Sequence, residues 1–373
     1  MRWNACLSLM LALGCAPSLP ARYVSARDAA EKAYSQKNYR GAAAHWHEAA
    51  QSAPSARARH EAEYREAASL ERAGDSDAAE VIYERLAGSG GERSERAAYA
   101  RAELNDSRSA KTAGLLALRA AVVRFPNSGM ARNAAYRFLE REAELGGDER
   151  ALTAAERLAT EVRGSEVEEA LLYARAKRLE ALGRYQAARD AYVDLANRFP
   201  YPRGAHWDEA LLAAARLDES AGRHTLAIRS LERLLAERET SRLNGSYERV
   251  GYAEARLQLA KIFRDGLADP ARARREFRRV WQDHPTSRLR DDALFEEALT
   301  ALSSGDPKGA CAPASLLQQK EAESRYVGCA AELCPDIAKG TGDCRSYLRQ
   351  QIEAARSRPT GEATHSSSSS SSR

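Results

Sequence analysis

The feature that most constrains this chain is a short phrase of residues that recurs along it. In the clearest copy, GRYQAARDAYVDLANRFP over 183–200, a Gly is followed by Tyr185, Ala188, Tyr192 and Leu195, and the phrase ends at a Pro. The last three of these positions are spaced i, i+4 and i+7, which places them on one face of a helix. The Gly supplies the preceding turn, and the Pro cannot continue the helix. The phrase therefore predicts the second helix of a helical pair.

Further copies of the phrase occupy most of the chain. They lie at 35–54, 71–88, 221–235 and 268–285, with weaker copies at 114–126 and 147–159. Equivalent positions are 37 residues apart from 39 to 76, and 39 residues apart from 185 to 224. A single helical pair cannot bury its apolar stripe alone, so such pairs must stack on one another. We interpret the recurring Tyr, Trp and Phe positions as core packing.

A period slightly above ~34 residues with this internal spacing resembles the tetratricopeptide repeat. The resemblance covers about residues 25 to 302. It implies an all-α fold, an α-solenoid wound as a right-handed superhelix from about seven helical pairs. Copies that end LANRFP or VWQDHP are similar to those of bacterial envelope lipoproteins, such as the β-barrel assembly lipoprotein and the Tol–Pal coordinator family. No functional residue carries over from that likeness.

The first residues have the layout of an export signal. MRWN contains one Arg, the apolar run ACLSLMLAL follows, and LALGC ends at Cys15. This run is too short to span a bilayer as a helix. LALGC resembles a bacterial lipobox, with Ala12 and Leu13 exchanged relative to the usual order, which implies that Cys15 is lipidated. Ala16 after it resembles lipoproteins sent to an outer membrane, where the chain would face the periplasm. Ordinary signal cleavage, giving a soluble periplasmic protein, and a cytosolic N-terminus remain alternatives.

Four further cysteines, Cys311, Cys329, Cys334 and Cys344, lie close together near the C-terminal end. In an oxidising compartment, an even number of cysteines indicates disulfides. Three pairings are possible, and we expect 311–329 with 334–344 because each closes a short local hairpin. Zinc is the alternative, but zinc ribbons use closely spaced Cys pairs, which this stretch lacks. We therefore expect no metal.

These features divide the chain into five segments. They are a signal peptide (1–14), a lipidated linker (15–25), the repeat array (26–302), a Cys-rich helical cap (303–352) and a disordered Ser-rich tail (353–373). A cap is expected because the last repeat of an array must cover an open core. The tail has too little apolar content to offset the cost of ordering. The stretch 237–251 lengthens one junction of the array and predicts a protruding loop or extended helix ends.

Residue patterns typical of catalysis are not found. No Gly-rich phosphate loop, HExxH helix or G-x-S-x-G elbow occurs. His45 and His47 are two residues apart, so on a helix they point to different sides and favour a surface role over metal binding. The net charge is only +4, which argues against a nucleic-acid partner. The basic run RARREFRR (272–279) favours a solvated helix face, with anionic lipid as the alternative. We expect no enzyme activity, no cofactor and no small-molecule substrate.

Protein binding is then the expected role. The resemblance implies that the first helix of each pair lines a concave groove, and Tyr and Arg are well suited to anchor a partner there. The projected groove residues are Tyr34, Tyr64, Tyr173, Lys177, Arg216, Lys261 and Arg264. The Lys and Asn set that clamps a carboxylate in chaperone-binding members is absent.

The sequence thus predicts a non-catalytic scaffold or adaptor that is lipid-anchored in a Gram-negative envelope, as a subunit of an envelope assembly or motility complex. Its partners would be other envelope proteins bound through the groove. A periplasmic partner of a signalling receptor and a peptidoglycan- or lipid-binding module are the alternatives.

Overall fold

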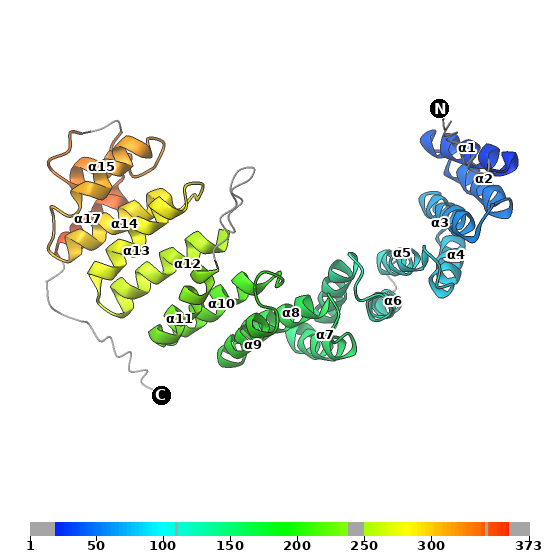
Figure 1. Cartoon of the computed structure of the whole chain (residues 1–373), viewed down its shortest axis with the longest axis horizontal. Helices are drawn as coiled ribbons and strands as arrows, with labels where there is room; N and C mark the ends of the chain where they lie inside the picture. The colour runs from blue at the N-terminus through cyan, green and yellow to red at the C-terminus, as the bar shows by residue number, and fades with distance from the viewer. Residues whose placement is uncertain (1–18, 109–110, 238–249, 340–341, 358–373) are drawn as a thin grey trace, which may run out of the picture. The chain divides into compact units, whose positions relative to one another are not determined.

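The computed structural model describes residues 19–108, 111–237, 250–339 and 342–357, in which every regular element is a helix (Figure 1). The chain divides into two compact units, Met1–Leu171 and Leu172–Arg373, with the boundary inside α8. No helix of the described part is long and apolar enough to cross a membrane. The predicted signal peptide and Cys15 lie outside the described residues, as does nearly all of the lengthened junction.

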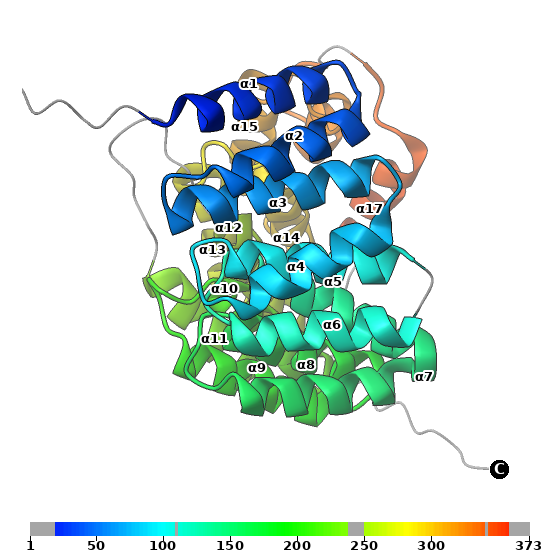
Figure 2. The ribbon, with the colours of Figure 1, turned by 90° about the vertical axis from the view of Figure 1, so that its right-hand side faces the viewer.

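In the first unit, each helix packs on the next (Figure 2). The helices are α1 (Ala21–Ser35), α2 (Tyr39–Gln51), α3 (Ala56–Arg72), α4 (Ser76–Gly88), α5 (Ser94–Ser107), α6 (Lys111–Arg124) and α7 (Ala131–Glu161). Gly146 and Gly147 adopt non-helical backbone angles inside α7. α7 is therefore broken into two helices, which together make a fourth pair.

The second unit continues the pattern and ends in shorter elements. Its helices are α8 (Glu168–Ala181), α9 (Tyr185–Arg198), α10 (Trp207–Ser220), α11 (His224–Ala236), α12 (Val250–Lys261), η1 (Ile262–Gly266), α13 (Pro270–Asp283), α14 (Arg290–Ser303), α15 (Cys311–Lys320), η2 (Val327–Cys329), α16 (Ala330–Leu333) and α17 (Ser346–Ser357). From α1 to α13 these form seven pairs, as expected. α14 begins an eighth pair whose second helix, α15, already belongs to the cap.

The opening phrase forms the turn and helix that its spacing predicts. Ala188, Tyr192 and Leu195 are all buried on one side of α9. Gly183 has φ 72°, a left-handed conformation that glycine adopts without strain. The helix stops at Arg198, two residues before the Pro. Trp46, Tyr83 and Phe277, at the position of Tyr192 in other copies, are likewise buried, which confirms their role in packing.

The cap packs on α14 rather than forming a separate core. Phe295 and Leu302 of α14 share a buried cluster with Leu317, Leu333 and Ile352 of the cap. The ring of Tyr326 stacks on Phe295 with centroids 4.3 Å apart. α17 continues to Ser357, past the expected end of the cap at residue 352. The cap thus covers the last open face of the array.

The predicted disulfide pairing is wrong, because the bridges are Cys311–Cys334 and Cys329–Cys344. Cys329 and Cys334 lie at opposite ends of the short helix α16, so they meet different parts of the chain. Cys334 reaches the start of α15, and Cys329 reaches the segment before α17. Gly328 permits the second approach, since a Cβ there would lie 2.7 Å from the Asp343 carbonyl oxygen.

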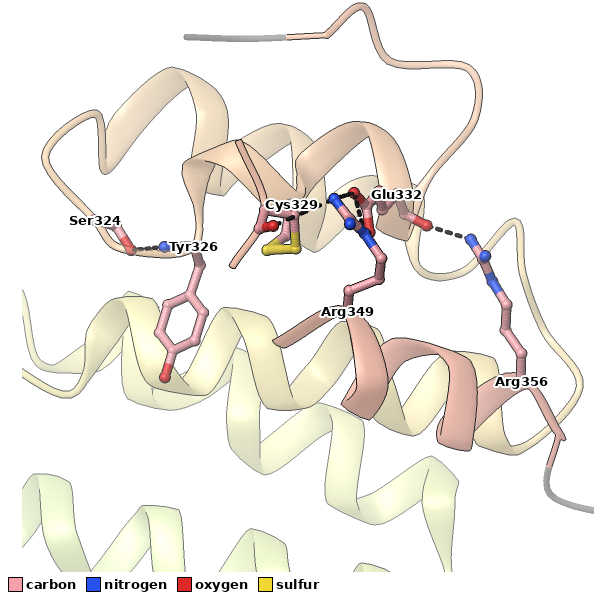
Figure 3. Close-up of a disulfide and its surroundings, with 7 residues drawn as sticks. Ser324, Tyr326, Cys329, Glu332, Arg349 and Arg356 are labelled. Carbon is pink, nitrogen blue, oxygen red and sulfur yellow. Dashed lines mark hydrogen bonds and ion pairs between the residues drawn. A yellow bond between two sulfur atoms is a disulfide. The ribbon is translucent and has the colours of Figure 1, made fainter. Parts of the chain in front are cut away.

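Side-chain contacts also tie α17 to α16 beside the second disulfide (Figure 3). The Arg349 guanidinium donates from Nε to Glu332 Oε1 at 3.0 Å and from Nη2 to the Cys344 carbonyl at 3.3 Å. Arg356 donates to the Glu332 carbonyl. The pairing of the cysteines is therefore part of a wider set of contacts within the cap.

Candidate partner-binding face

A cavity opens on the first-helix side of the first unit, between α1, α2 and α3. Its volume is about 290 Å³, and we call it the Tyr34 cavity. It is lined by Glu31, Tyr34, Ser35, Trp46, Arg65, Ala68 and Ser69. The Tyr34 side chain is 40% exposed, whereas Trp46 is buried beneath the rim. An accessible aromatic above a buried one is a suitable anchor site for a partner side chain.

The Tyr34 cavity is held in shape by local hydrogen bonds. Ser69 Oγ donates to the Arg65 carbonyl at 2.8 Å, and Arg65 Nε donates to Glu61 Oε1 at 2.9 Å. The ring of Tyr34 meets Tyr39 edge to face, with centroids 5.2 Å apart. The cavity thus combines an apolar wall with one acidic group, Glu31, and one basic group at its rim.

Two aromatic arrangements further along the chain are near-copies of one another. In α3 and α4, Tyr64 lies 5.7 Å from Tyr83, whose hydroxyl donates to Glu71 Oε2 at 3.0 Å. The second copy adds 109 to each residue number and reproduces both contacts. There, Tyr173 lies 5.9 Å from Tyr192, whose hydroxyl donates to Glu180 Oε2 at 3.0 Å.

The tyrosine hydroxyls in these two copies are fixed donors. Burial raises the pKa of Tyr83 and of Tyr192 well above the usual value, and the neighbouring carboxylates of Glu71 and Glu180 raise it further. Both hydroxyls therefore remain protonated and donate to the carboxylates at physiological pH. Each copy also carries a cation over its outer ring. These cations are Arg93, 5.7 Å from the Tyr64 centroid, and Lys177, 5.9 Å from that of Tyr173.

The structure brings together three of the groove residues predicted in the second unit. Tyr173 and Lys177 are neighbours on α8, and His206 stacks on the Tyr173 ring with centroids 4.3 Å apart and planes 3° from parallel. Arg216 of α10 donates to Glu180 Oε1 at 2.7 Å. Tyr173 is half-buried, whereas Arg216 and Lys177 remain exposed although each contacts a neighbouring side chain.

The remaining two predicted groove residues lie near η1. Arg264 donates to Asp265 Oδ1 at 2.9 Å and also to Glu296 of α14, and its guanidinium lies over the Phe277 ring. Its role is therefore to join neighbouring helices. Lys261 is half-buried. Among the seven predicted residues, Tyr34 is the aromatic that is exposed.

Comparison with known families identifies one repeat of the array. Residues 254–287, which span most of α12 to α13, match the tetratricopeptide repeat model. The chain contains a tetratricopeptide repeat at this position. No curated protein sequence matches the chain.

Solved structures with a similar fold share little sequence with it. The C-terminal part of a TPR repeat-containing protein from Cytophaga hutchinsonii is 14% identical, and the match covers 71% of this chain and 97% of that one at a TM-score of 0.42. The apo form of RapI is 11% identical, covering 90% and 97%, at 0.43. A tetratricopeptide repeat protein from Parabacteroides merdae is 13% identical, covering 74% and 98%, at 0.33.

Four residues that matter to this face were not among the predicted groove set. Trp46 and Arg65 line the Tyr34 cavity, His206 stacks on Tyr173, and Glu180 binds both Tyr192 and Arg216. The repeat itself held a signal for Glu180, because it follows Tyr173 by the same seven residues that separate Glu71 from Tyr64. The stacking of His206, from the loop before α10, has no such repeated spacing.

The described residues hold one cluster with the geometry of a metal site, which consists of Cys311, Cys334 and Asp336. Its two sulfurs are joined in a disulfide and are not thiolate ligands. His47 pairs with Glu66 at 3.0 Å, and His45 lies 3.6 Å from Glu48. The two imidazoles thus have separate carboxylate neighbours.

The basic run on α13 has a solvated face of exposed arginines, as its pattern predicted, and most of its arginines are also paired with carboxylates. Arg272 and Arg279 are exposed, and each pairs with a carboxylate of its own helix or of the residue that caps it. Arg274 and Arg278 bind Asp306 and Glu297 at 2.7 Å. Arg275 is the exposed arginine of this run without an acidic partner among the described residues.

Proposed function

We propose that this chain is a non-catalytic scaffold that binds a protein partner through its first-helix face and is held at an envelope membrane by an acyl group on Cys15. The observation that carries the binding role is the Tyr34 cavity, where an exposed tyrosine stands over a buried tryptophan. Aromatic side chains in such pockets dominate the binding energy of many interfaces.

The chemistry of the Tyr34 cavity indicates what part of a partner would enter it. Trp46 and Ala68 provide an apolar wall that suits an aliphatic or aromatic side chain, while Glu31 and Arg65 at the rim suit flanking polar groups of both signs. Its volume of about 290 Å³ accommodates one or two side chains and is small for a whole cofactor. We therefore assign the cavity to a protein segment.

The proposed membrane attachment is supported by the sequence LALGC ending at Cys15 and by the two disulfides of the cap. Structural disulfides form in oxidising compartments such as the bacterial periplasm. An acylated cysteine that carries two or more chains anchors a protein stably. In this arrangement the partner would be another envelope protein, as part of an assembly or motility complex.

The binding role is tested by substituting Tyr34→Ala beside a matched control, Tyr185→Ala. Tyr185 is 59% exposed at the start of α9, a second helix, so its loss leaves the proposed face intact. We expect crosslinking of native-host membranes to give partner adducts with the wild type and with Tyr185→Ala, and to lose them with Tyr34→Ala. Equal adducts from all three proteins would refute the assignment of the cavity, and retention on purified sacculi without any protein would favour a peptidoglycan-binding module instead.

The anchor is tested separately, by intact mass and membrane fractionation of the wild type beside Cys15→Ser. We expect the wild type to carry acyl mass and to sediment with the outer membrane, while the variant lacks that mass. A wild type without acyl mass would exclude the anchor without affecting the cavity.

A further inference from the structure

The positive charge of the chain is concentrated at its N-terminal end. Residues 19–60 hold seven Lys or Arg against three Asp or Glu, a net charge of +4, whereas residues 61–373 hold 49 against 50, a net charge of −1. The net charge of the whole protein therefore resides in the first helical pair and the start of α3. Beyond them the acidic and basic groups balance.

Most of these N-terminal cations are exposed and have no acidic partner among the described residues. They are Arg22, Lys32, Lys37, Arg40 and Arg59. Other arginines, such as Arg274 and Arg278 on α13, are paired with carboxylates. In the same region, Arg27 is paired with Asp28 at 2.8 Å and Arg57 with Glu92 at 2.8 Å.

Arg22 and Lys32 are both exposed, near the two ends of α1, which is the first helix of its unit (Figure 2). Tyr23, Ala26, Ala30 and Ala33 form the buried side of this helix, which packs against α2. At 3.6 residues per turn, ten residues bring Lys32 to within about 80° of Arg22 around the helix axis and about 15 Å along it. Leu19, which is 48% exposed, precedes α1 at the start of the described chain.

The acidic groups of α1 do little to neutralise the positive charge of Arg22 and Lys32. Asp28 is paired with Arg27, and Glu31 lines the Tyr34 cavity. Exposed cations along a helix that is preceded by an exposed leucine have the chemistry of a membrane-surface contact, because anionic headgroups attract the cations while the apolar side chain enters the interface.

Chain length places the start of α1 beside the proposed anchor. Four residue steps separate Cys15 from Leu19, and a fully extended chain spans at most about 3.5 Å per residue. An acyl group on Cys15 would therefore hold the start of α1 within about 14 Å of the bilayer. Charge attraction to a membrane acts over a Debye length of about 8 Å at physiological salt, and a link of at most about 14 Å permits the start of α1 to approach the bilayer to that distance.

We propose that the exposed cations of α1 and of the turn after it, Arg22, Lys32 and Lys37, bind the anionic lipid surface of the membrane and provide a second attachment beside the acyl chain. This proposal deepens the membrane attachment proposed above and rests on it for the position of α1. Contact through these cations would orient α1 on the bilayer surface.

The test uses the full chain with Cys15→Ser, which carries no acyl group, and sedimentation with vesicles. Phosphatidylcholine vesicles are compared with vesicles that contain roughly 30% phosphatidylglycerol, at low and high salt. We expect binding to the anionic vesicles to exceed binding to the neutral ones and to fall as salt rises. Each cation near an anionic surface strengthens partitioning by about fivefold, so Arg22→Glu with Lys32→Glu should weaken it by at least about 25-fold.

The matched control is Arg229→Glu with Arg275→Glu in the same background. These arginines are exposed on α11 and α13, have no acidic partner among the described residues, and give the same change in net charge. We expect the control to bind like the parent. The apolar run 5–13 is common to every variant, so differences between them isolate the cations.

The possible results distinguish failure of this lipid-binding proposal from failure of the proposed acyl anchor on Cys15. Equal binding to neutral and anionic vesicles, or equal weakening by both double variants, would overturn the assignment of the α1 cations even if the wild type is acylated. Salt-sensitive binding that is lost only with Arg22→Glu and Lys32→Glu supports it, and it does so even if the mass of the wild type excludes an acyl group.

Discussion

Ala268 has φ 49°, at a turn position where most other repeats of this protein have glycine. It lies two residues before α13, as Gly74, Gly183 and Gly222 lie two residues before α4, α9 and α11. A residue with a Cβ costs roughly 1–2 kcal/mol in the left-handed region, whereas glycine does not. The turn before α13 is therefore a site where the protein departs from its own repeat at some cost in stability.

We predict that Ala268→Gly raises the free energy of unfolding by about 0.5 kcal/mol, because relief of the left-handed conformation outweighs the greater freedom of glycine in the unfolded chain. Urea denaturation measures the change. Gly222→Ala is the reverse control, and it should lower stability by about 1 kcal/mol since Gly222 has φ 71°. Loss of stability in Ala268→Gly would show that the turn is not strained.

Between elements, one buried carboxylate joins α5 to α7. The Asp106 side chain is only 2% exposed and accepts from Arg141 Nε at 2.8 Å and from Arg137 Nη2 at 2.6 Å. The hydrogen bond from Arg141, followed by that from Arg137, lowers the pKa of Asp106 below its usual value. The ionised carboxylate is thus the form that holds the two helices together.

We predict that Asp106→Asn destabilises the protein by about 2 kcal/mol near neutral pH, since it replaces charged hydrogen bonds by neutral ones. A depressed folded-state pKa gives stability that is present above the unfolded pKa near 3.9 and is lost as pH falls through the folded value. The difference between wild type and variant should therefore be constant from pH 7 to about 5 and shrink below about 4. Urea denaturation across this pH range measures it.

An exposed acid provides the comparison for Asp106. Asp194 is 65% exposed and lies 3.9 Å from Arg198, so Asp194→Asn should change stability by less than about 0.5 kcal/mol at any pH. If Asp106→Asn behaves in the same way, the link between α5 and α7 does not depend on the charge of Asp106.

The same two scales show what the sequence could predict. Burial of Ala188, Tyr192 and Leu195 followed from their spacing, because a helical face depends only on nearby residues. Arg216 and Arg264 were assigned to the groove, but their partners Glu180 and Glu296, which lie 36 and 32 residues away, were not predicted. Such partners depend on how successive repeats stack, and spacing within one repeat does not reveal that.

The cap shows more clearly which contacts cannot be predicted from the sequence. Its cysteines were expected to pair in sequence order, since short loops close most easily. The observed bridges do not follow sequence order, because Cys329 and Cys334 lie at opposite ends of α16. Cys329 therefore lies beside the segment before α17, and Cys334 lies beside the start of α15. The turn of a single short helix decides the pairing, and nothing in the Cys spacing specifies its direction.

At the scale of the whole molecule, an array of repeats has local stability, because each pair contacts mainly its neighbours. The cap stabilises α14 through the cluster around Phe295 and Tyr326, and its disulfides constrain the unfolded cap. A bridge that closes a loop of about 15 residues contributes roughly 3 kcal/mol in the chain-entropy account. Loss of one bridge should therefore affect the end of the array and leave its start unchanged.

We predict that Cys329→Ser with Cys344→Ser increases hydrogen exchange in α14, α15 and α17 and leaves exchange in α1 to α4 unchanged, as measured by mass spectrometry. The same variant tests the pairing, because Cys311 and Cys334 should remain joined and resist a thiol reagent without reduction. Two reactive thiols at these positions would indicate that the bridges follow sequence order. A uniform rise in exchange along the chain would show that the array unfolds as one cooperative body, so the cap would then stabilise even the distant repeats that carry the Tyr34 cavity.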